Sequence, residues 1–460
     1  MKKYFYSCVF LLVFIIPVNR EFTNPPYKLL KRLDIPSPLL QTRQGLPFGG
    51  DIRVGDLENN GKLGIVVYRT ANSVEGGASQ PSFLAALNLK GEILWQKGTG
   101  GEQPNRPGPV AIHDIDADGK NEVISLFAHA PESVTPFSMQ GVSLKIYDSE
   151  SGREERSIDS PLLQQASGKG PNWVHQRILI TNLRGLDTPQ DFIIKLGKTI
   201  YAFDHTLSLL WTYYNPNDVY QNCPAYIPAV GDVDNDGKDE INGGYYLLDD
   251  TGEVLWERKL GKNMDCVLID YWDNDTRKRA ICSGFGFVMG ATGDTVMHVG
   301  KELIPHGQEL RVGDFDKKYT GREMMVRYNG HKPDIHLIGQ KGHLIRSFQL
   351  NDSPNHTGME VVQWQGKRKA AYLYNGGALW NGTGKRVCQF AELNAQPKGD
   401  KRQGWYHCIA VDISGDAGEE IVLYNPWEAS IFIYSANRKG WKQIKKFVPT
   451  SKQYNPRLMD

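Results

Sequence analysis

Two short segments of the chain place acidic side chains at the alternating spacing that a calcium ion needs. They read DIDADGKNE (Asp114 to Glu122) and DVDNDGKDE (Asp232 to Glu240). Alternating carboxylates converge on one centre and the glycine permits a sharp turn, so the segments predict a Ca²⁺ site. The predicted ligands are Asp114, Asp116, Asp118, Asp232, Asp234 and Asp236. The alternative is a metal-free turn capped by side-chain hydrogen bonds, because no helix follows the acids.

A second set of polar residues stands beside successive apolar strands and has the composition needed to act on an acidic sugar. The set comprises His113, His175, Gln176, Arg177, Tyr220, Asn222, Asp265, His306, Gln308, Trp405, Tyr406 and His407. These residues fall at equivalent points of successive repeats, so we expect them to ring one face of a central axis.

Such a ring suits proton abstraction from a uronate. An arginine neutralises the sugar carboxylate and acidifies the C5 proton, and a histidine or tyrosine then removes that proton. We therefore predict His175 and His306 as catalytic residues. The predicted sugar-binding residues of the ring are His113, Arg177, Tyr220, Gln308, Trp405 and Tyr406. The alternative is that these polar side chains only line a wet channel.

The scaffold for both sets is a sequence repeat. An apolar strand, an acidic turn and a second strand recur, as in IRVGDLENNGKLGIVVY, and a hairpin such as YYLLDDTGEVLWE follows each time. Two such halves give four short strands, the size of a propeller blade. We count eight repeats and predict an all-β chain with one β-propeller of eight four-stranded blades over residues 50–445. Seven blades stay open as an alternative.

The flanking segments and the charge balance bear on location and partners. Residues 1–20 combine two lysines with an apolar run, which predicts a signal peptide and an exported protein in the periplasm or at the surface of a bacterium. Residues 21–49 form a leader and 446–460 a closing segment, and either could supply the strand that closes the ring. Lys plus Arg number 53 against 52 Asp plus Glu, which favours no nucleic acid partner and no membrane insertion once the signal is removed. Five scattered cysteines remain after signal removal, so at least one thiol is expected to be free or to bond another chain.

The leader ends in TRQGLPFGGDIRVGDL, where polar residues and glycines precede the first strand. The glycines are explained by a chain that must turn into its strand with little side-chain bulk. Arg43, Gln44 and Arg53 are candidates for contact with an acidic sugar, because arginine pairs well with a carboxylate.

The repeat with VGDVDNDGKDE and DDTGEVLWE, together with GLPFGGDIRVGDL, resembles propeller carbohydrate enzymes of bacteria. These are the rhamnogalacturonan lyases of polysaccharide lyase family 11, the rhamnose-glucuronate lyases of family 27, and the exo-α-L-rhamnosidases of glycoside hydrolase family 145. The resemblance covers nearly the whole mature chain. In the rhamnosidases a histidine near the N-terminus is essential, and Gln44 stands nearest to its position here. Glutamine cannot act as an acid or base near neutral pH, which puts that hydrolysis in doubt.

The resemblance implies a secreted protein acting on L-rhamnose-α-1,4-D-glucuronate caps of arabinogalactan, rhamnosidase-like, with Gln44 in place of the catalytic histidine. One alternative is a polysaccharide lyase that cleaves rhamnose-uronate linkages by β-elimination through the His/Tyr/Arg ring. Another is a non-catalytic glycan-binding propeller. All three share a ligand, an acidic rhamnose-containing plant glycan. The repeat count of eight agrees with family 11, whereas the hydrolase and family 27 propellers have seven blades.

Overall fold

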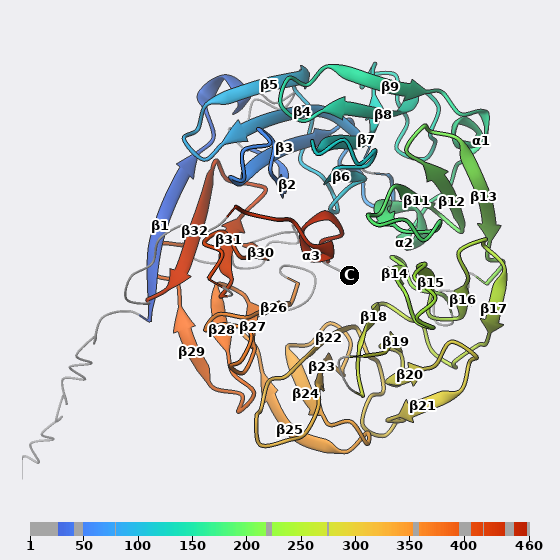
Figure 1. Ribbon diagram of the computed structural model, residues 1–460, viewed down its shortest axis with the longest axis vertical. Helices are drawn as coiled ribbons and strands as arrows, with labels where there is room; N and C mark the ends of the chain where they lie inside the picture. Colours follow the sequence, from blue (N-terminus) through green and yellow to red (C-terminus); the bar gives the residue numbers. More distant parts are fainter. Residues whose placement is uncertain are drawn as a thin grey trace, which may run out of the picture.

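The computed structural model describes residues 26–40, 49–78, 80–217, 223–273, 276–352, 358–394, 406–416, 418–437 and 446–457. In these ranges eight four-stranded antiparallel sheets surround a central axis (Figure 1). The prediction of a single β-propeller with eight blades is confirmed, and the seven-bladed alternative is wrong.

Each blade is a meander that runs from the axis outward, so its first strand is the innermost one. Blade 1 consists of β2 (Asp51–Gly55), β3 (Gly64–Thr70), β4 (Pro81–Asn88) and β5 (Ile93–Gly98). Blade 2 consists of β6 (Val110–His113), β7 (Glu122–Ala128), β8 (Val142–Asp148) and β9 (Glu154–Ile158). Blade 3 consists of β10 (Arg177–Thr181), β11 (Asp191–Leu196), β12 (Thr199–Asp204) and β13 (Leu209–Tyr214). Blade 4 consists of β14 (Ala229–Gly231), β15 (Glu240–Asn242), β16 (Tyr246–Leu248) and β17 (Val254–Glu257).

The second half of the ring repeats this order. Blade 5 consists of β18 (Val267–Tyr271), β19 (Lys278–Cys282), β20 (Phe287–Met289) and β21 (Thr295–His298). Blade 6 consists of β22 (Glu309–Gly313), β23 (Glu323–Arg327), β24 (Asp334–Ile338) and β25 (Leu344–Gln349). Blade 7 consists of β26 (Glu360–Val362), β27 (Tyr372–Asn375), β28 (Ala378–Trp380) and β29 (Arg386–Gln389). Blade 8 consists of β30 (His407–Val411), β31 (Glu420–Tyr424), β32 (Ser430–Ala436) and β1 (Tyr27–Asp34).

The ring is closed by strand β1 of the leader. It pairs antiparallel with β32, so the two ends of the propeller meet in one sheet, and Leu33 lies opposite Ile431. Leu33 is 3% exposed and packs in the core between blades 8 and 1. The leader, one of the two segments that the sequence left open for this role, thus supplies the closing strand and removes the unpaired edge of blade 8.

Apolar residues form layers between neighbouring blades rather than one central core. A cluster of buried side chains lies at each of the eight junctions, and their members come mainly from the first three strands of the two blades concerned. In blades 1 to 7 the pairing of the third and fourth strands shifts register once. Such bulges increase the strand twist, which lets each outer hairpin follow the strongly twisted blade.

Tryptophans on the outer strands lock one blade to the next. Trp95 of blade 1 covers the hairpin glycine Gly152 of blade 2, where any added Cβ would clash with the indole. Its Nε1 donates a hydrogen bond of 2.7 Å to the Ser149 carbonyl in the same hairpin. Trp211 repeats this contact on Gly252 between blades 3 and 4. Trp95 and Trp211 therefore pack neighbouring blades together.

Helices in the described ranges are short. They are η1 (Ser37–Leu40), α1 (Pro161–Gln165), α2 (Pro171–Val174) and α3 (Ser451–Tyr454). Within the described residues no helix has both the length and the apolar character needed to cross a membrane. The proposed signal peptide, residues 1–20, lies outside the described residues. The five cysteines of the described ranges, Cys223, Cys266, Cys282, Cys388 and Cys408, are free thiols and buried.

The glycines of the leader allow a close approach of the chain. A Cβ on Gly49 would clash with Ile35, and a Cβ on Gly50 would clash with the carbonyl oxygen of Tyr68. Gly50 also has φ of +125°, which side chains rarely tolerate. The structure thus agrees with the packing explanation of the leader glycines.

Candidate catalytic site

Ionisable residues gather where the inner strands begin, on what we call the strand-start face. Four of them stand at the same register, five residues before the first residue of the turn that follows the strand: Asp51, Arg177, Glu309 and His407. A fifth, Asp265, lies two residues before β18. Each is at most 3% exposed. Because the inner strands are equivalent and adjacent in the ring, these positions bring the five side chains to one end of the axis. The acidic turns lie at the opposite end, the acidic-turn face.

Asp51 is the centre of one closed network on this face. Its carboxylate accepts hydrogen bonds from the hydroxyls of Tyr68 and Tyr424 and lies 3.3 Å from Arg53 Nη1. Arg53 also donates to the carbonyls of Val110 (2.9 Å) and Gly108 (2.8 Å) in blade 2. Burial raises the pKa of both tyrosines, which stay protonated donors.

The other residues beside this network are also held in place. Burial lowers the pKa of His407 to about 4, so its imidazole is neutral at pH 7. Its ring lies 5.4 Å from that of Tyr424. With Arg53 donating to backbone carbonyls of blade 2, the network joins blades 8, 1 and 2. The sugar contact of Arg53 stays a prediction, and the structure shows that the same side chain ties blade 1 to blade 2.

His175 lies just after α2 and is also enclosed. Its Nε2 accepts a hydrogen bond of 2.9 Å from Arg106 Nε, and its ring meets Tyr226 edge-on at 5.2 Å. Burial lowers the pKa of His175 well below the usual value, and Arg106 and Arg177 act in the same direction. The neighbouring Gln176 is fully buried, and neither of its amide atoms has a hydrogen-bond partner among the described residues. His175 is therefore neutral, with one nitrogen occupied by an arginine.

His306 is the most accessible titratable residue of the predicted ring among those that the structure describes. Its side chain is 33% exposed, and its Nε2 lies 2.9 Å from Oδ2 of Asp265. Asp265 is 2% exposed and accepts a second hydrogen bond from Asn263 Nδ2. The backbone of His306 is fixed by hydrogen bonds with Tyr328 (3.0 Å) and Gly330 (2.9 Å). An oriented histidine with a buried carboxylate behind it is the arrangement of a general base.

The remaining predicted residues divide into three groups. Gln308 is buried directly before β22, and its backbone N–H donates to the Arg327 carbonyl. Tyr406 is fully buried and donates a hydrogen bond of 2.5 Å to Glu428, so it packs blade 8. Arg43, Gln44, Tyr220, Asn222 and Trp405 lie outside the described residues.

The placement of His113 on the ring was wrong. His113 is the last residue of β6 and lies next to the acidic turn, where Nε2 is 2.9 Å from the Pro189 carbonyl and the ring meets Tyr454 at 4.7 Å. It stands one residue before the turn, whereas Asp51, Arg177, Glu309 and His407 stand five before it. One strand length therefore separates it from the strand-start face.

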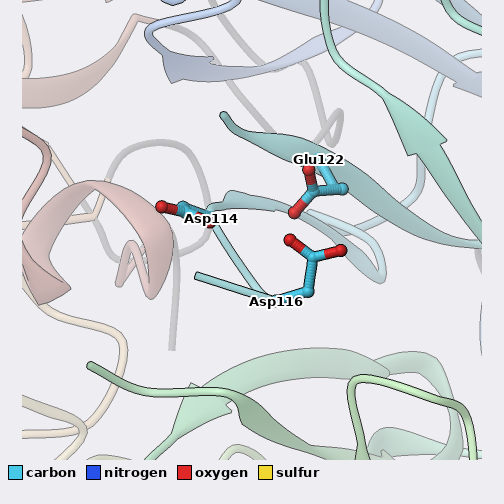
Figure 2. Close-up of side chains that lie close together, drawn as sticks. All are labelled: Asp114, Asp116 and Glu122. Carbon is cyan, nitrogen blue, oxygen red and sulfur yellow. The ribbon is translucent and has the colours of Figure 1, made fainter. Parts of the chain in front are cut away.

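The acidic turns gather their carboxylates as Figure 2 shows for blade 2. Asp114, Asp116 and Glu122 have carboxylate oxygens within 4.8 Å of one another, and so do Asp232, Asp234 and Glu240. Glutamates at the end of each turn thus join the predicted aspartates, whereas Asp118 and Asp236 are not part of the groups.

The same carboxylates also cap the turns. Glu122 Oε2 accepts a hydrogen bond of 2.9 Å from the backbone of Ile115, and Asp114 Oδ2 accepts one of 3.1 Å from Gly119. Burial and the nearby aspartates raise the pKa of Glu122 to about 9 and that of Glu240 to about 8. Asp114 Oδ1 is buried with no hydrogen-bond partner among the described residues. Crowded carboxylates with an unused oxygen fit a hard cation such as Ca²⁺. The same turn can therefore be capped by its side chains and still offer ligands to a metal.

The comparisons with known proteins agree with the lyase alternative. The sequence model of the rhamnogalacturonan lyase family 11, C-terminal domain, matches residues 195–455, more than half of the chain. The solved structure of rhamnogalacturonan lyase YesW is 19% identical with a TM-score of 0.66, over 89% of this chain and 76% of that one. The Bacillus licheniformis rhamnogalacturonan lyase PL11 is also 19% identical with a TM-score of 0.66, over 94% of this chain and 78% of that one.

The chain is also similar in structure to proteins whose names indicate other functions. The biofilm matrix protein Bap1 of V. cholerae is 12% identical with a TM-score of 0.58, over 92% of this chain and 93% of that one. No curated protein sequence matches the chain. At these identities the solved structures establish the propeller fold alone, and neither they nor the family match support the rhamnosidase branch of the resemblance. The match over residues 195–455 shows that the chain belongs to the rhamnogalacturonan lyase family 11.

Proposed function

We propose that this protein is an exported polysaccharide lyase that cleaves a rhamnose-uronate linkage in a rhamnogalacturonan-type plant glycan by β-elimination. The observation that carries the proposal is the pair of His306 and Asp265 on the strand-start face. Of the two histidines predicted as catalytic, His306 is partly exposed, whereas His175 is enclosed and bonded to Arg106. Membership of family 11 supports the reaction class.

The roles follow from the hydrogen bonds. Asp265 accepts the Nε2 hydrogen of His306, which leaves the lone pair on Nδ1 for the C5 proton of the uronate. The C5–H electron pair then forms the C4–C5 double bond, the C4–O bond breaks with its electron pair on the leaving oxygen, and that oxygen takes a proton from water. Asp265 stabilises the imidazolium formed in this step.

The sugar carboxylate needs a cation, and the chain places one close by. Lys332 is exposed and follows two residues after Gly330, whose backbone donates to the His306 carbonyl. In this proposal Lys332 pairs with the carboxylate and makes the C5 proton more acidic. A bound Ca²⁺ at Asp114, Asp116 and Glu122, or at Asp232, Asp234 and Glu240, would neutralise the crowded carboxylates and stiffen the acidic-turn face. Residues 1–20 would direct export to the periplasm or cell surface.

The test is incubation of the purified protein with rhamnogalacturonan and with gum arabic, followed by ultraviolet absorbance of the unsaturated uronate and by free rhamnose. We expect absorbance with the wild-type protein, its loss with His306→Gln, and its retention with His343→Gln. His343 is an exposed histidine on the outer hairpin of the same blade. Free rhamnose without absorbance would show that the protein is a rhamnosidase and not a lyase. Retention of the glycan with neither product would leave a binding protein.

A further inference from the structure

The C-terminal segment, residues 446–457, lies inside the ring. Its helix α3 contacts the inner strands β30, β2, β6 and β10, and Figure 1 shows α3 near the centre of the propeller. Gln453 donates to the Ala410 carbonyl in blade 8, and Asn455 exchanges two hydrogen bonds with Ile180 in blade 3. The segment thus fills one side of the axis.

On the other side a cavity of about 300 Å³ remains between this segment and blades 3 to 7. This volume is at the lower end of the range of small-molecule sites. Its lining in blades 5 and 6 comes from the later residues of β18 and β22, which lie towards the acidic turns. None of His175, His306 and His407 lines it. The cavity is therefore distinct from the candidate catalytic site.

The cavity has two unlike walls. Blades 3 to 5 contribute an apolar wall that includes Leu179, Ile227, Val230, Leu268 and Ile269. The opposite wall is charged and comes from blades 5 to 7 and the C-terminal segment. Its lining carries Arg311, Arg322, Lys452 and Arg457 together with Asp270 and Glu360. Two carboxylates from outside the lining also pair with these cations, Glu309 with Arg311 at 3.2 Å and Glu419 with Lys452 at 2.9 Å.

The ion pairs on the charged wall differ in the distance between their charged atoms. Lys452 lies 2.9 Å from Glu419 and 3.3 Å from Glu360, whereas Arg322 reaches Asp270 at only 3.4 Å. Arg322 is 29% exposed and Asp270 35% exposed, so this pair can be opened by a competing anion. Burial raises the pKa of Glu360, whereas Lys452 and Arg311 act in the opposite direction.

An apolar wall facing a cationic one suits a molecule with a ring of C–H groups and a carboxylate. We propose that this cavity is a second ligand site, which binds a small sugar acid with the ring on the apolar wall and the carboxylate at Arg322. The preference for an anion rests on the lining alone. The choice of a sugar acid rests on the proposed function.

The experiment is isothermal titration calorimetry of the full chain with galacturonate, and with galactose as the neutral counterpart. Wild-type protein and His306→Gln should bind galacturonate equally, and galactose should bind at least about tenfold more weakly. Arg322→Gln should weaken galacturonate binding about tenfold, as expected for loss of one charge-assisted hydrogen bond. Arg184→Gln is the matched control, because Arg184 is 36% exposed and paired with Asp191 at 2.8 Å but does not line the cavity.

Several outcomes would overturn the inference. They are no binding of galacturonate, equal affinity for galactose, or full affinity in a folded Arg322→Gln variant. Loss of binding in His306→Gln with retention in Arg322→Gln would place the ligand on the strand-start face instead. Binding of galacturonate by a wild-type protein that performs no elimination would refute the proposed function and leave the cavity site standing.

Discussion

Replacing Asp265 by asparagine tests whether this carboxylate orients the proposed base. Asp265 is 2% exposed, and one oxygen accepts from His306 Nε2 at 2.9 Å while the other accepts from Asn263. An asparagine amide in the same place presents an N–H₂ to Nε2, so the imidazole must carry its proton on Nδ1. The nitrogen that faces substrate would then have no lone pair. We expect kcat to fall by about 10² to 10⁴, the range for loss of an oriented general base.

The assay is the initial rate of ultraviolet absorbance on rhamnogalacturonan, with KM measured separately. A fall in kcat with little change in KM is expected, because Asp265 acts through His306. The double variant Asp265→Asn with His306→Gln should be no slower than His306→Gln alone. A kcat for Asp265→Asn within a factor of about three of wild type, with the fold intact, would refute the reasoning.

Three predictions concern stability, and thermal or urea unfolding checks each. Without added metal the unfolding temperature should fall as pH rises from about 5 to 9, because the pKa of Glu122 is raised in the folded protein to about 9, above its ordinary value. Added Ca²⁺ should make this fall smaller, and a fall that Ca²⁺ leaves unchanged would count against metal in the turns. Gly50→Ala should lower the free energy of unfolding by about 2 kcal/mol or more through positive φ and a clash, whereas Gly300→Ala, with positive φ but open space, should cost less. Lys452→Met should cost about 3 kcal/mol by leaving buried carboxylates uncompensated, and adding Glu419→Gln should recover part of it; no recovery would mean that the loss is one of packing.

The propeller could be predicted because every repeat has the same order and spacing of strands and turns. A strand, an acidic turn, a strand and a hairpin recur with the same spacing, and one blade cannot bury both of its faces. Ring closure was less predictable, because β1 has a polar sequence, YKLLKRLD, in which Leu33 is a deeply buried side chain. Its partner β32 lies some 400 residues later, and the sequence offers no local signal for that pairing.

The sequence predicts which residues lie at the start of the inner strands, but it does not predict which side chains those residues contact. Counting back from the acidic turn selects Asp51 and Glu309, which sequence reasoning missed, and rejects His113, which it included. Residue type could not show that His175 is enclosed by Arg106, because that contact joins segments 69 residues apart. His306 is partly exposed and His175 is buried, and this difference arises only when the blades pack together.

The register also separates the two groups of ionisable side chains in the repeat. Side chains five residues before the turn reach the strand-start face, whereas the acids of the turn lie at the other end of the same strand. In blade 2 the acidic group Asp114, Asp116 and Glu122 therefore lies away from the His306 and Asp265 pair of blades 5 and 6. Substitutions in the two groups share no partner, so their effects on unfolding should add within about 0.5 kcal/mol. A larger coupling between Asp114→Asn and Asp265→Asn would show that the two faces communicate through the inner strands.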